Sequence, residues 1–456
     1  RDIRTAFDIA LEDHVQTGFY RPNLHLEVHR AEARERLALL TERVAAIQGP
    51  TIVYVTLQKT AEQVAAHLKA QGFTAEAYHA GMGSDDRSAV QERFMQDATR
   101  VVVATIAFGM GIDKADIRAV LHFNLPKSLE SYSQEIGRAG RDGEPSRCEL
   151  FACGDDRAVL EAFSYGDTPT RASLHAMVTE LFGAGERFAV SRYQLSRDHD
   201  IRPLVVATVL TQLELQGHLV ATGPFYAGYQ LSLTESESAL LARFDPARQA
   251  FIRAVLDGGK RGRTWITLDL DVVAANLEEP RERIVAMVGY LEQIGAARVK
   301  PSQLRHGYRR PQPLQVEPVV EALVALFEER EQKDLARTAQ VVAFTEQSTC
   351  LTASLVGYFG EERAPCGHCG PCLGAIGGPL PTSTPPAWTE REEALVREVH
   401  AEGHGALVQP RQLTRFLCGL RSPKTQGRNG LQNDRRFGAL EHRPFPEVLV
   451  RAQALG

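Results

Sequence analysis

The chain has 456 residues, 43% of them hydrophobic, which predicts a globular protein of roughly two to four domains. Its formal net charge of −5 argues against a general nucleic-acid coat and leaves room for local basic patches. No run of eighteen uncharged apolar residues occurs, so we expect no membrane partner. The seven cysteines include four between Cys350 and Cys372, which predicts a metal site in an intracellular, cytoplasmic protein rather than a disulfide framework.

The first third of the chain alternates predicted strands with predicted helices. Apolar runs predict strands at 51–55, 75–79, 100–105, 119–123 and 148–151. The helix between the first two strands has one apolar face, from Ala61 to Leu68, and Ser84 is the expected N-cap of the next helix. This order predicts an α/β lobe with a mostly parallel sheet and helices on both faces.

The segment after the third of these strands is a candidate ligand-binding loop. In open parallel sheets ligands bind beyond the carboxyl ends of the strands. The loop runs from Ile106 to Asp113 and contains Gly109 and Gly111, which permit close backbone approach, and one carboxylate.

A second candidate segment, Gln134 to Gly143, contains two arginines and several small residues. Because Arg138 and Arg141 are three residues apart, we expect them to share one face of a helix. Guanidinium groups on such a surface suit phosphate recognition, since each donates bidentate hydrogen bonds and stays charged. A solvated arginine pair on a surface helix is the alternative.

Both segments carry a family resemblance. Val103–Lys114 and Tyr132–Gly143 resemble motifs V and VI of the RecQ family of DNA helicases, in residue type and in spacing. The strand at 51–56 resembles motif IV, and Tyr78–Met82 resembles the segment that follows it. The match covers roughly residues 15–155 and implies the second RecA-like lobe of an ATP-dependent DNA helicase.

The resemblance assigns catalytic roles to three residues. It implies that Arg141 is an arginine finger that contacts the γ-phosphate of ATP held by the opposite lobe. Arg138 would support the finger, and Gln134 would couple nucleotide state to lobe closure.

The resemblance also assigns binding roles. Asp113, with Gly109 and Gly111, would lie near the nucleotide ribose or the interface between lobes. Thr105 would donate a hydrogen bond to a DNA phosphate, although it could simply terminate a strand. His79 is more often a structural histidine than a base.

The sequence contains no Gly-x-x-x-x-Gly-Lys-Ser/Thr, the phosphate cradle of Walker A. In the family, that cradle belongs to a first lobe that holds most of ATP and Mg²⁺, and we expect such a lobe to precede Arg1. We expect the full protein to unwind DNA 3′ to 5′ in recombination and repair, and this chain alone to be inactive. The alternatives are a non-catalytic DNA-binding module that carries an arginine finger in trans, and an RNA-dependent translocase.

The middle third contains an internal repeat of helix, Gly stop and strand, at 205–220 and 284–299. A short helix and a turn precede each copy, and hairpin candidates follow around 223–226 and 300–308. Helix, turn, helix and wing predict two tandem winged-helix units. In the common RecQ arrangement the zinc module directly follows the second lobe, so the order here leaves the strand-separating residues unassigned.

The expected wings differ in chemistry. Arg305, Arg309 and Arg310 lie near the second wing and predict contacts with DNA phosphates. The first wing is uncharged and aromatic around Phe225 and Tyr226, so it either packs against the lobe or wedges against a base pair. The expected DNA partners are single strands and duplex junctions.

Four thiols form a candidate metal centre, Cys350, Cys366, Cys369 and Cys372. Three lie in a Gly/Pro-rich knuckle and one lies upstream, a set that can hold a metal tetrahedrally. The cluster resembles the RecQ zinc-binding module and implies zinc, with an iron–sulfur cluster or a redox dithiol as alternatives. His368 is expected to point outward, and Cys148 to be a small core residue.

These patterns predict a RecA-like α/β lobe with a parallel sheet, then mostly α winged-helix domains and a small zinc-binding module. The expected boundaries are 1–165 for the lobe, 166–240 and 241–315 for the winged-helix-like units, 316–376 for a helical segment with the four-cysteine module, 377–387 for a linker and 388–456 for a small helical segment of unread function.

Overall fold

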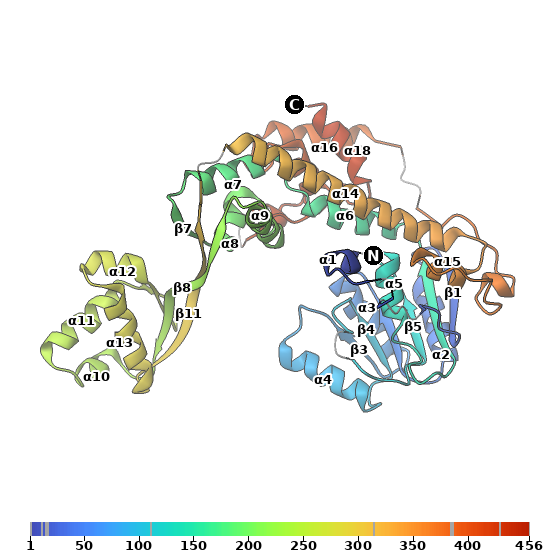
Figure 1. The fold of residues 1–456 in the computed structure, drawn as a ribbon, viewed down its shortest axis with the longest axis horizontal. Helices are drawn as coiled ribbons and strands as arrows, with labels where there is room; N and C mark the ends of the chain where they lie inside the picture. Colours follow the sequence, from blue (N-terminus) through green and yellow to red (C-terminus); the bar gives the residue numbers. More distant parts are fainter. Residues whose placement is uncertain are drawn as a thin grey trace. The chain divides into compact units, whose positions relative to one another are not determined.

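A six-stranded parallel sheet organises the first part of the chain in the computed structural model (Figure 1). The structure describes residues 2–10, 12–13, 18–109, 112–312, 315–383, 387–427 and 430–455. The strand order is β1-β6-β5-β2-β4-β3, and every neighbouring pair is parallel. The strands are β1 (Leu24–Arg30), β2 (Thr51–Tyr54), β3 (Ala75–Tyr78), β4 (Val101–Ala104), β5 (Ala119–His122) and β6 (Ser146–Ala152). The predicted parallel sheet is confirmed.

Helices cover both faces of this sheet because its central strands are apolar on both sides. One core includes Val90 of α4 and Tyr132 of α5, and the other includes Val44 of α2 and Leu68 of α3. The helices of this part are α1 (Asp2–Ala6), α2 (Arg36–Ala46), α3 (Gln58–Ala70), α4 (Ser84–Met95), α5 (Leu129–Ile136) and α6 (Asp156–Asp167). The apolar face predicted for α3 is buried as expected, whereas the N-cap of α4 is Gly83 rather than Ser84.

The strand β1 was not among the predicted strands. It pairs with β6 along its whole length, and its side chains alternate, with Leu24 and Leu26 buried. Histidine and glutamate occupy the positions between, so no continuous apolar run marks this strand in the sequence.

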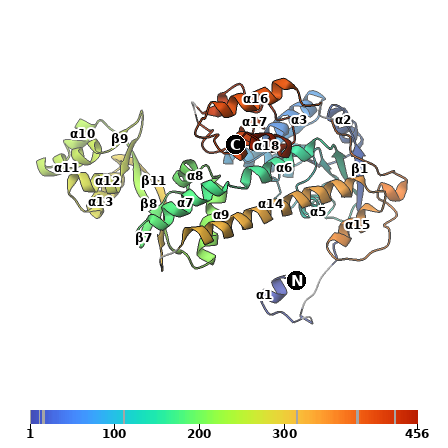
Figure 2. The same cartoon turned by 90° about the horizontal axis from the view of Figure 1, so that it is seen from above.

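The chain divides into two compact units. The first contains residues 1–165, 329–393 and 442–447, and the second contains 166–328, 394–441 and 448–456. The long helix α14 (Val316–Glu346), labelled in Figure 2, has residues in both units. The first unit also holds α15 (Leu351–Tyr358) and the 3₁₀ helix η1 (Pro371–Leu373).

The second unit contains two helical cores joined by one antiparallel ribbon. The strands β8 (Val220–Leu233) and β11 (Ala297–Arg309) pair from end to end. The separate hairpins predicted around 223–226 and 300–308 are therefore wrong, because those segments pair with each other across the ribbon. A sequence repeat does not reveal this, since a strand's partner can lie far along the chain.

Each core includes side chains from one end of the ribbon. The first core is built from α7 (Arg171–Gly183), α8 (Arg192–His199), α9 (Pro203–Leu215) and the first part of α14. The second is built from α10 (Glu237–Leu241), α11 (Pro246–Asp257), α12 (Leu270–Leu277) and α13 (Arg281–Gln293). Three short strands, β7 (Arg187–Val190), β9 (Lys260–Arg261) and β10 (Ile266–Asp269), complete a five-stranded sheet of order β7-β11-β8-β10-β9.

The last elements are α16 (Glu390–Ala401), α17 (Pro410–Leu417), the 3₁₀ helix η2 (Leu431–Asn433) and α18 (Phe445–Gln453). Buried Asp200 fixes part of this segment to the first helical core, because its carboxylate accepts bonds from the Gln412 amide at 2.9 Å and the Lys424 backbone N–H at 2.8 Å. Within the described residues, every helix is too short or too polar to cross a bilayer.

Candidate functional site

The loop that follows β4 lies at the carboxyl edge of the parallel sheet. The backbone N–H of Thr105 donates to the Tyr78 carbonyl at 3.2 Å, and the Thr105 carbonyl accepts from the Phe108 N–H at 3.0 Å. Thr105 is 9% exposed, so its side chain lies at the rim of the core. Gly111 lies outside the described residues.

Two side chains hold consecutive carbonyls of this loop. The Tyr54 hydroxyl at the end of β2 donates to the Phe108 carbonyl at 2.9 Å. The Arg138 guanidinium donates to the Gly109 carbonyl. Burial raises the pKa of Tyr54, so this phenol stays protonated and remains a donor.

Gly109 has φ +147°, and a Cβ there would overlap the Arg138 guanidinium. The glycine is therefore needed for the close approach of Arg138 to the loop backbone.

The predicted finger Arg141 is exposed and pairs with the loop carboxylate. Its Nη1 lies 2.8 Å from Oδ1 of Asp113, and the two side chains are 38% and 91% exposed. Since both charges face solvent, this ion pair is weak and exchangeable. The two residues predicted to lie near the nucleotide, Asp113 and Arg141, are therefore side by side. The third, Gln134, is exposed on α5.

The prediction that Arg138 and Arg141 share a helix face is wrong. The helix α5 ends at Ile136, and both arginines lie in the turns that follow. Gly140 has φ +53°, a left-handed conformation that favours glycine.

The turn is braced from the segment before β1. The Gly140 carbonyl accepts from Arg21 at 2.6 Å and from Asn23 at 2.8 Å. Neither these two residues nor Tyr54 was found from the sequence, because a lone arginine, asparagine or strand tyrosine carries no spacing signal.

A buried contact between a histidine and a glutamate lies near the end of α5. His122 at the end of β5 and Glu135 on α5 are 2.7 Å apart, and the Tyr54 ring stacks on His122 at a centroid distance of 5.4 Å. This packing joins the ends of β2 and β5 to the helix that precedes the arginines.

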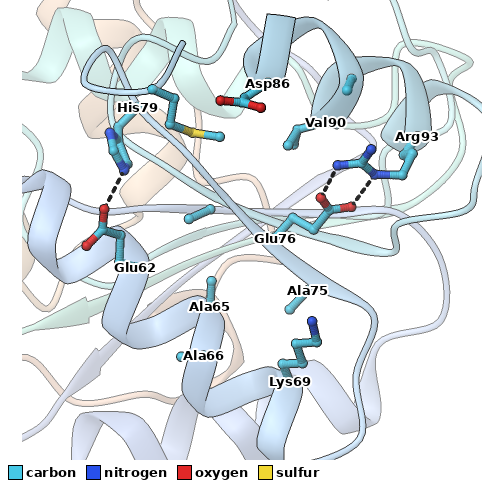
Figure 3. Close-up of a pocket in the computed structure, with 13 residues that line it drawn as sticks. Glu62, Ala65, Ala66, Lys69, Ala75, Glu76, His79, Asp86, Val90 and Arg93 are labelled. Atoms are coloured by element: carbon cyan, nitrogen blue, oxygen red, sulfur yellow. Dashed lines mark hydrogen bonds and ion pairs between the residues drawn. The ribbon is translucent and has the colours of Figure 1, made fainter.

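A shallow groove lies elsewhere in the lobe, between α3, β3 and α4 (Figure 3). Four of its polar residues form two pairs. His79 lies 3.2 Å from Glu62, and Arg93 binds Glu76 with two hydrogen bonds. His79 is 5% exposed, which fits a structural histidine better than a catalytic base.

The four predicted metal ligands come together. The sulfur atoms of Cys350, Cys366, Cys369 and Cys372 all lie within 4.8 Å of one another, and all four thiols are free. The Cys350 sulfur caps α15, so this cysteine begins a helix, and it accepts backbone N–H groups from Ala353 at 3.4 Å and Cys366 at 3.2 Å. Donors aimed at sulfur stabilise thiolates, so the cluster fits a closed four-sulfur zinc site.

The cysteine knuckle is attached to the edge of the lobe's sheet. The Gly370 N–H donates to the Leu26 carbonyl of β1 at 2.9 Å. His368 contacts the Tyr20 hydroxyl at 3.3 Å and is not part of the four-sulfur set. The described part of the expected linker also contacts the lobe, since Gly154 donates to the Pro381 carbonyl at 2.8 Å.

A second cluster of metal-ligand types, Glu27, His29 and Glu149, already has a cation. Arg43 donates two hydrogen bonds of 2.7 Å to the Glu149 carboxylate, and His29 lies 3.0 Å from it. The guanidinium neutralises this group, so the cluster is an ion-pair network of the sheet and not a metal site.

The three arginines predicted to contact DNA from the second wing do not lie beside the second helical core. Arg305 and Arg309 lie in the half of β11 that pairs with β7 and the start of β8, and the Arg310 N–H donates to the Glu186 carbonyl at 2.8 Å. This half of β11 contributes Tyr308 to the first helical core. The three arginines therefore belong with the first core and not with the second.

The carboxyl-edge arginines and the four-cysteine centre fall within or beside two stretches that match known family models. Residues 35–143 match the family described as "Helicase conserved C-terminal domain", and residues 320–373 match "RecQ zinc-binding". Over these two stretches the chain is similar to the C-terminal region of RecQ-family helicases.

Curated proteins similar to this chain include ATP-dependent DNA helicases. The chain is 44% identical over 159 residues to "ATP-dependent DNA helicase RecQ" of Bacillus subtilis, covering 35% of this chain and 27% of the relative. It is 30% identical over 308 residues to "ATP-dependent DNA helicase Q-like 5" of Arabidopsis thaliana, covering 65% of this chain and 33% of the relative. The chain thus spans about a third or less of the length of these relatives.

Solved structures match over shorter stretches. A DEAD box protein from Methanococcus jannaschii is 27% identical, covering 28% of this chain and 36% of that chain, with a TM-score of 0.27. Dbp5 of S. cerevisiae bound to RNA and ADP BeF3 is 21% identical, covering 33% of this chain and 41% of that chain, with a TM-score of 0.30.

Proposed function

We propose that this chain supplies the second motor lobe and the DNA-holding region of an ATP-dependent DNA helicase that unwinds DNA 3′ to 5′ in recombination and repair. The observation that carries the proposal is the placement of Arg141 beside Asp113 at the carboxyl edge of the parallel sheet. An exposed guanidinium in a weak ion pair can leave its carboxylate for a more highly charged phosphate.

The chemistry is phosphoryl transfer to water, in which the protein mainly positions groups and stabilises charge. ATP and Mg²⁺ are the substrate pair, held mainly by a first lobe. Arg141 would donate to the γ-phosphate as charge builds there. Arg138 would keep the loop backbone in register through Gly109, and Thr105 would contact a DNA phosphate.

The zinc proposed for the four cysteines is structural. Four sulfur ligands leave no open position for a reacting water. The knuckle has no core of its own, and a bound metal would hold Cys366–Cys372 against Cys350 and so against β1.

The two helical cores are proposed to be winged-helix units that share one long wing. Each has two helices joined by a turn, α8–α9 and α12–α13, followed by a strand of the ribbon. The proposed partners are single-stranded DNA and duplex junctions, in a cytoplasmic protein.

DNA-stimulated ATP hydrolysis tests the proposal. The chain is assayed with and without a supplied first helicase lobe, using single-stranded DNA, duplex DNA and RNA as cofactors. The helicase proposal expects turnover and unwinding only when both the lobe and DNA are present. Stimulation by RNA alone would instead indicate an RNA translocase. DNA binding without turnover in the presence of the lobe would favour the DNA-binding module.

A further inference from the structure

The strands β11, β8, β10 and β9 form a sheet with two unlike faces. One face carries Leu231, Ile266 and Leu268, which are buried against the helices α10–α13. Because side chains alternate along a strand, the residues between them point to the opposite face. That opposite face is polar and only partly covered.

A row of paired residues can be followed across this polar face, since direct pairing partners share a face. The row is Lys300, Gln230, Thr267 and Lys260. Three steps between neighbouring strands separate the two lysines, which corresponds to about 14 Å at the usual strand spacing. Arg298 and Trp265 lie on the same face, each two residues along from a member of the row.

The cations of this face are free of acidic partners. Lys260, Lys300 and Arg298 are all exposed, and no salt bridge involves them within the described part of the chain. Lys300 Nζ instead lies 4.6 Å from the centroid of the Trp265 ring. Asp269 is the one carboxylate that these strands place on the face, and it caps α12 by accepting from the Val272 N–H at 3.2 Å. In a chain of net charge −5, this is a local positive surface with an aromatic ring in it.

We infer that this face binds single-stranded nucleic acid. The three cations would contact backbone phosphates, and the Trp265 indole would stack on an unpaired base. Double-stranded DNA fits less well, because its bases are already stacked and its grooves suit a helix or a ribbon rather than an open sheet face. The assignment to DNA rests on the proposed helicase function, whereas single-stranded RNA presents the same phosphates and base faces.

Tryptophan fluorescence tests this site directly in the full chain. The chain has two tryptophans, so a Trp388→Phe background leaves Trp265 as the reporter. Titration with oligo(dT) of about twenty nucleotides should quench Trp265 emission, because a stacked base contacts the indole. Parallel titrations use oligo(U) and a blunt duplex. Tighter binding of oligo(dT) assigns the site to DNA, and tighter binding of oligo(U) assigns it to RNA.

Charge reversal supplies the second measurement. Lys260→Glu/Lys300→Glu should weaken oligo(dT) binding at least about tenfold and lower the salt slope by about 1.4, the value for two lost phosphate contacts on a single strand. The matched control is Arg253→Glu, an exposed arginine on α11, whose helix packs on the other face of the sheet. This control should change affinity less than about twofold, since α11 packs on the other face of the sheet and Arg253 makes none of the proposed phosphate contacts.

Unquenched Trp265 at saturating oligo(dT) and oligo(U) would overturn the inference. So would a double variant that binds both oligonucleotides as tightly as the Arg253→Glu control, with circular dichroism confirming that each variant is folded. Preferential binding of the duplex would also overturn it. These readouts need no ATP hydrolysis. Quenching without DNA-stimulated turnover, even with a first lobe supplied, would therefore refute the proposed function and leave this site standing.

Discussion

The hydroxyl of Tyr54 donates a hydrogen bond of 2.9 Å to the backbone carbonyl of Phe108. The next carbonyl of the loop, that of Gly109, is held by Arg138. One end of β2 and the turn that carries Arg141 therefore hold adjacent carbonyls of the same loop, those of Phe108 and Gly109. We infer that Tyr54 is a positioning residue that keeps the loop in register with the arginines.

Removing this hydroxyl should loosen the loop without unfolding the lobe. Tyr54→Phe leaves the ring packed and loses one buried hydrogen bond, worth about 1 kcal/mol, which corresponds to about fivefold faster local opening. Hydrogen exchange of peptides that span 105–113 measures it in the chain alone. With a first lobe supplied, the activation of ATP hydrolysis by DNA should also weaken.

Tyr78→Phe is the matched control. The Tyr78 side chain is partly buried, and its ring packs edge-on against Phe108 of the same loop at a centroid distance of 4.7 Å. Exchange should stay at the wild-type rate in this variant. Equal acceleration by both substitutions would mean that ring packing, and not the Tyr54 hydroxyl, holds the loop.

The Arg141 side chain should be needed for turnover and dispensable for folding. In the chain supplied with a first lobe, Arg141→Ala should abolish unwinding and lower ATP hydrolysis about 10³–10⁵-fold, a loss of about 4–7 kcal/mol of transition-state stabilisation. DNA binding should stay near the wild-type level. Steady-state ATPase and anisotropy titrations measure the two effects separately.

Arg34→Ala provides the comparison, because the Arg34 side chain is 79% exposed and pairs only with nearby Glu32 in the described structure. It should leave both activities unchanged. ATP hydrolysis by Arg141→Ala at the Arg34→Ala rate would identify Arg141 as a surface arginine that pairs with Asp113 and has no part in catalysis.

Features that are determined by residues close together in the sequence could be predicted from it. Four-residue strands such as β2 and β4 are buried at every position, so an uninterrupted apolar run marked them. The cysteine ligands were found because three of them lie close together in sequence. The loop and turn residues were found by motif, but the end of α5 at Ile136 was missed, because the spacing of Arg138 and Arg141 fits a helix equally well.

Features that depend on distant pairing were not predictable from local patterns. In β1, the alternation of apolar and polar residues is compatible with a surface loop until β6 is placed beside it. The ribbon was missed for the same reason. The local sequence of β8 and of β11 each fits the first strand of a separate hairpin, and only their pairing with each other shows otherwise. The polar face with Trp265 exists only because four strands meet in that register.

The metal centre should be structural, and its loss should unfold only the cysteine knuckle. Cys369→Ser should lower zinc content from one equivalent per chain, since sulfur is replaced by a ligand that does not ionise, and it should unfold the knuckle. The α/β lobe should stay folded, and DNA binding should weaken. Elemental analysis and limited proteolysis measure these outcomes.

Cys418→Ser is the control for loss of a thiol, because Cys418 lies outside the four-sulfur set. Its zinc content should equal that of the wild type. A purified, reduced chain without zinc, or full zinc retention in Cys369→Ser, would contradict the zinc assignment. Iron with sulfide in place of zinc would support the iron–sulfur alternative.

The ion-pair network at Glu149 should make the α/β lobe acid-sensitive. Although burial raises the pKa of Glu149, the hydrogen bonds from His29 and Arg43 outweigh it and lower the pKa from 4.5 to about 2. A carboxylate whose pKa is lower in the folded state stabilises the fold at pH values above its unfolded-state pKa. This stabilisation is lost as the pH falls towards 2. The contribution at neutral pH is on the order of 3 kcal/mol for this shift.

Glu149→Gln should therefore destabilise the lobe at pH 7. The difference in free energy of unfolding between wild type and variant should become smaller between about pH 4.5 and 2. Urea titrations followed by hydrogen exchange of β1 and β6 peptides report on this unit alone. Glu144→Gln, which neutralises an exposed carboxylate of the same lobe, should leave the curve unchanged. A wild-type to Glu149→Gln gap that stays constant from pH 7 to 3 would show that the effect comes from packing and not from the ionised carboxylate.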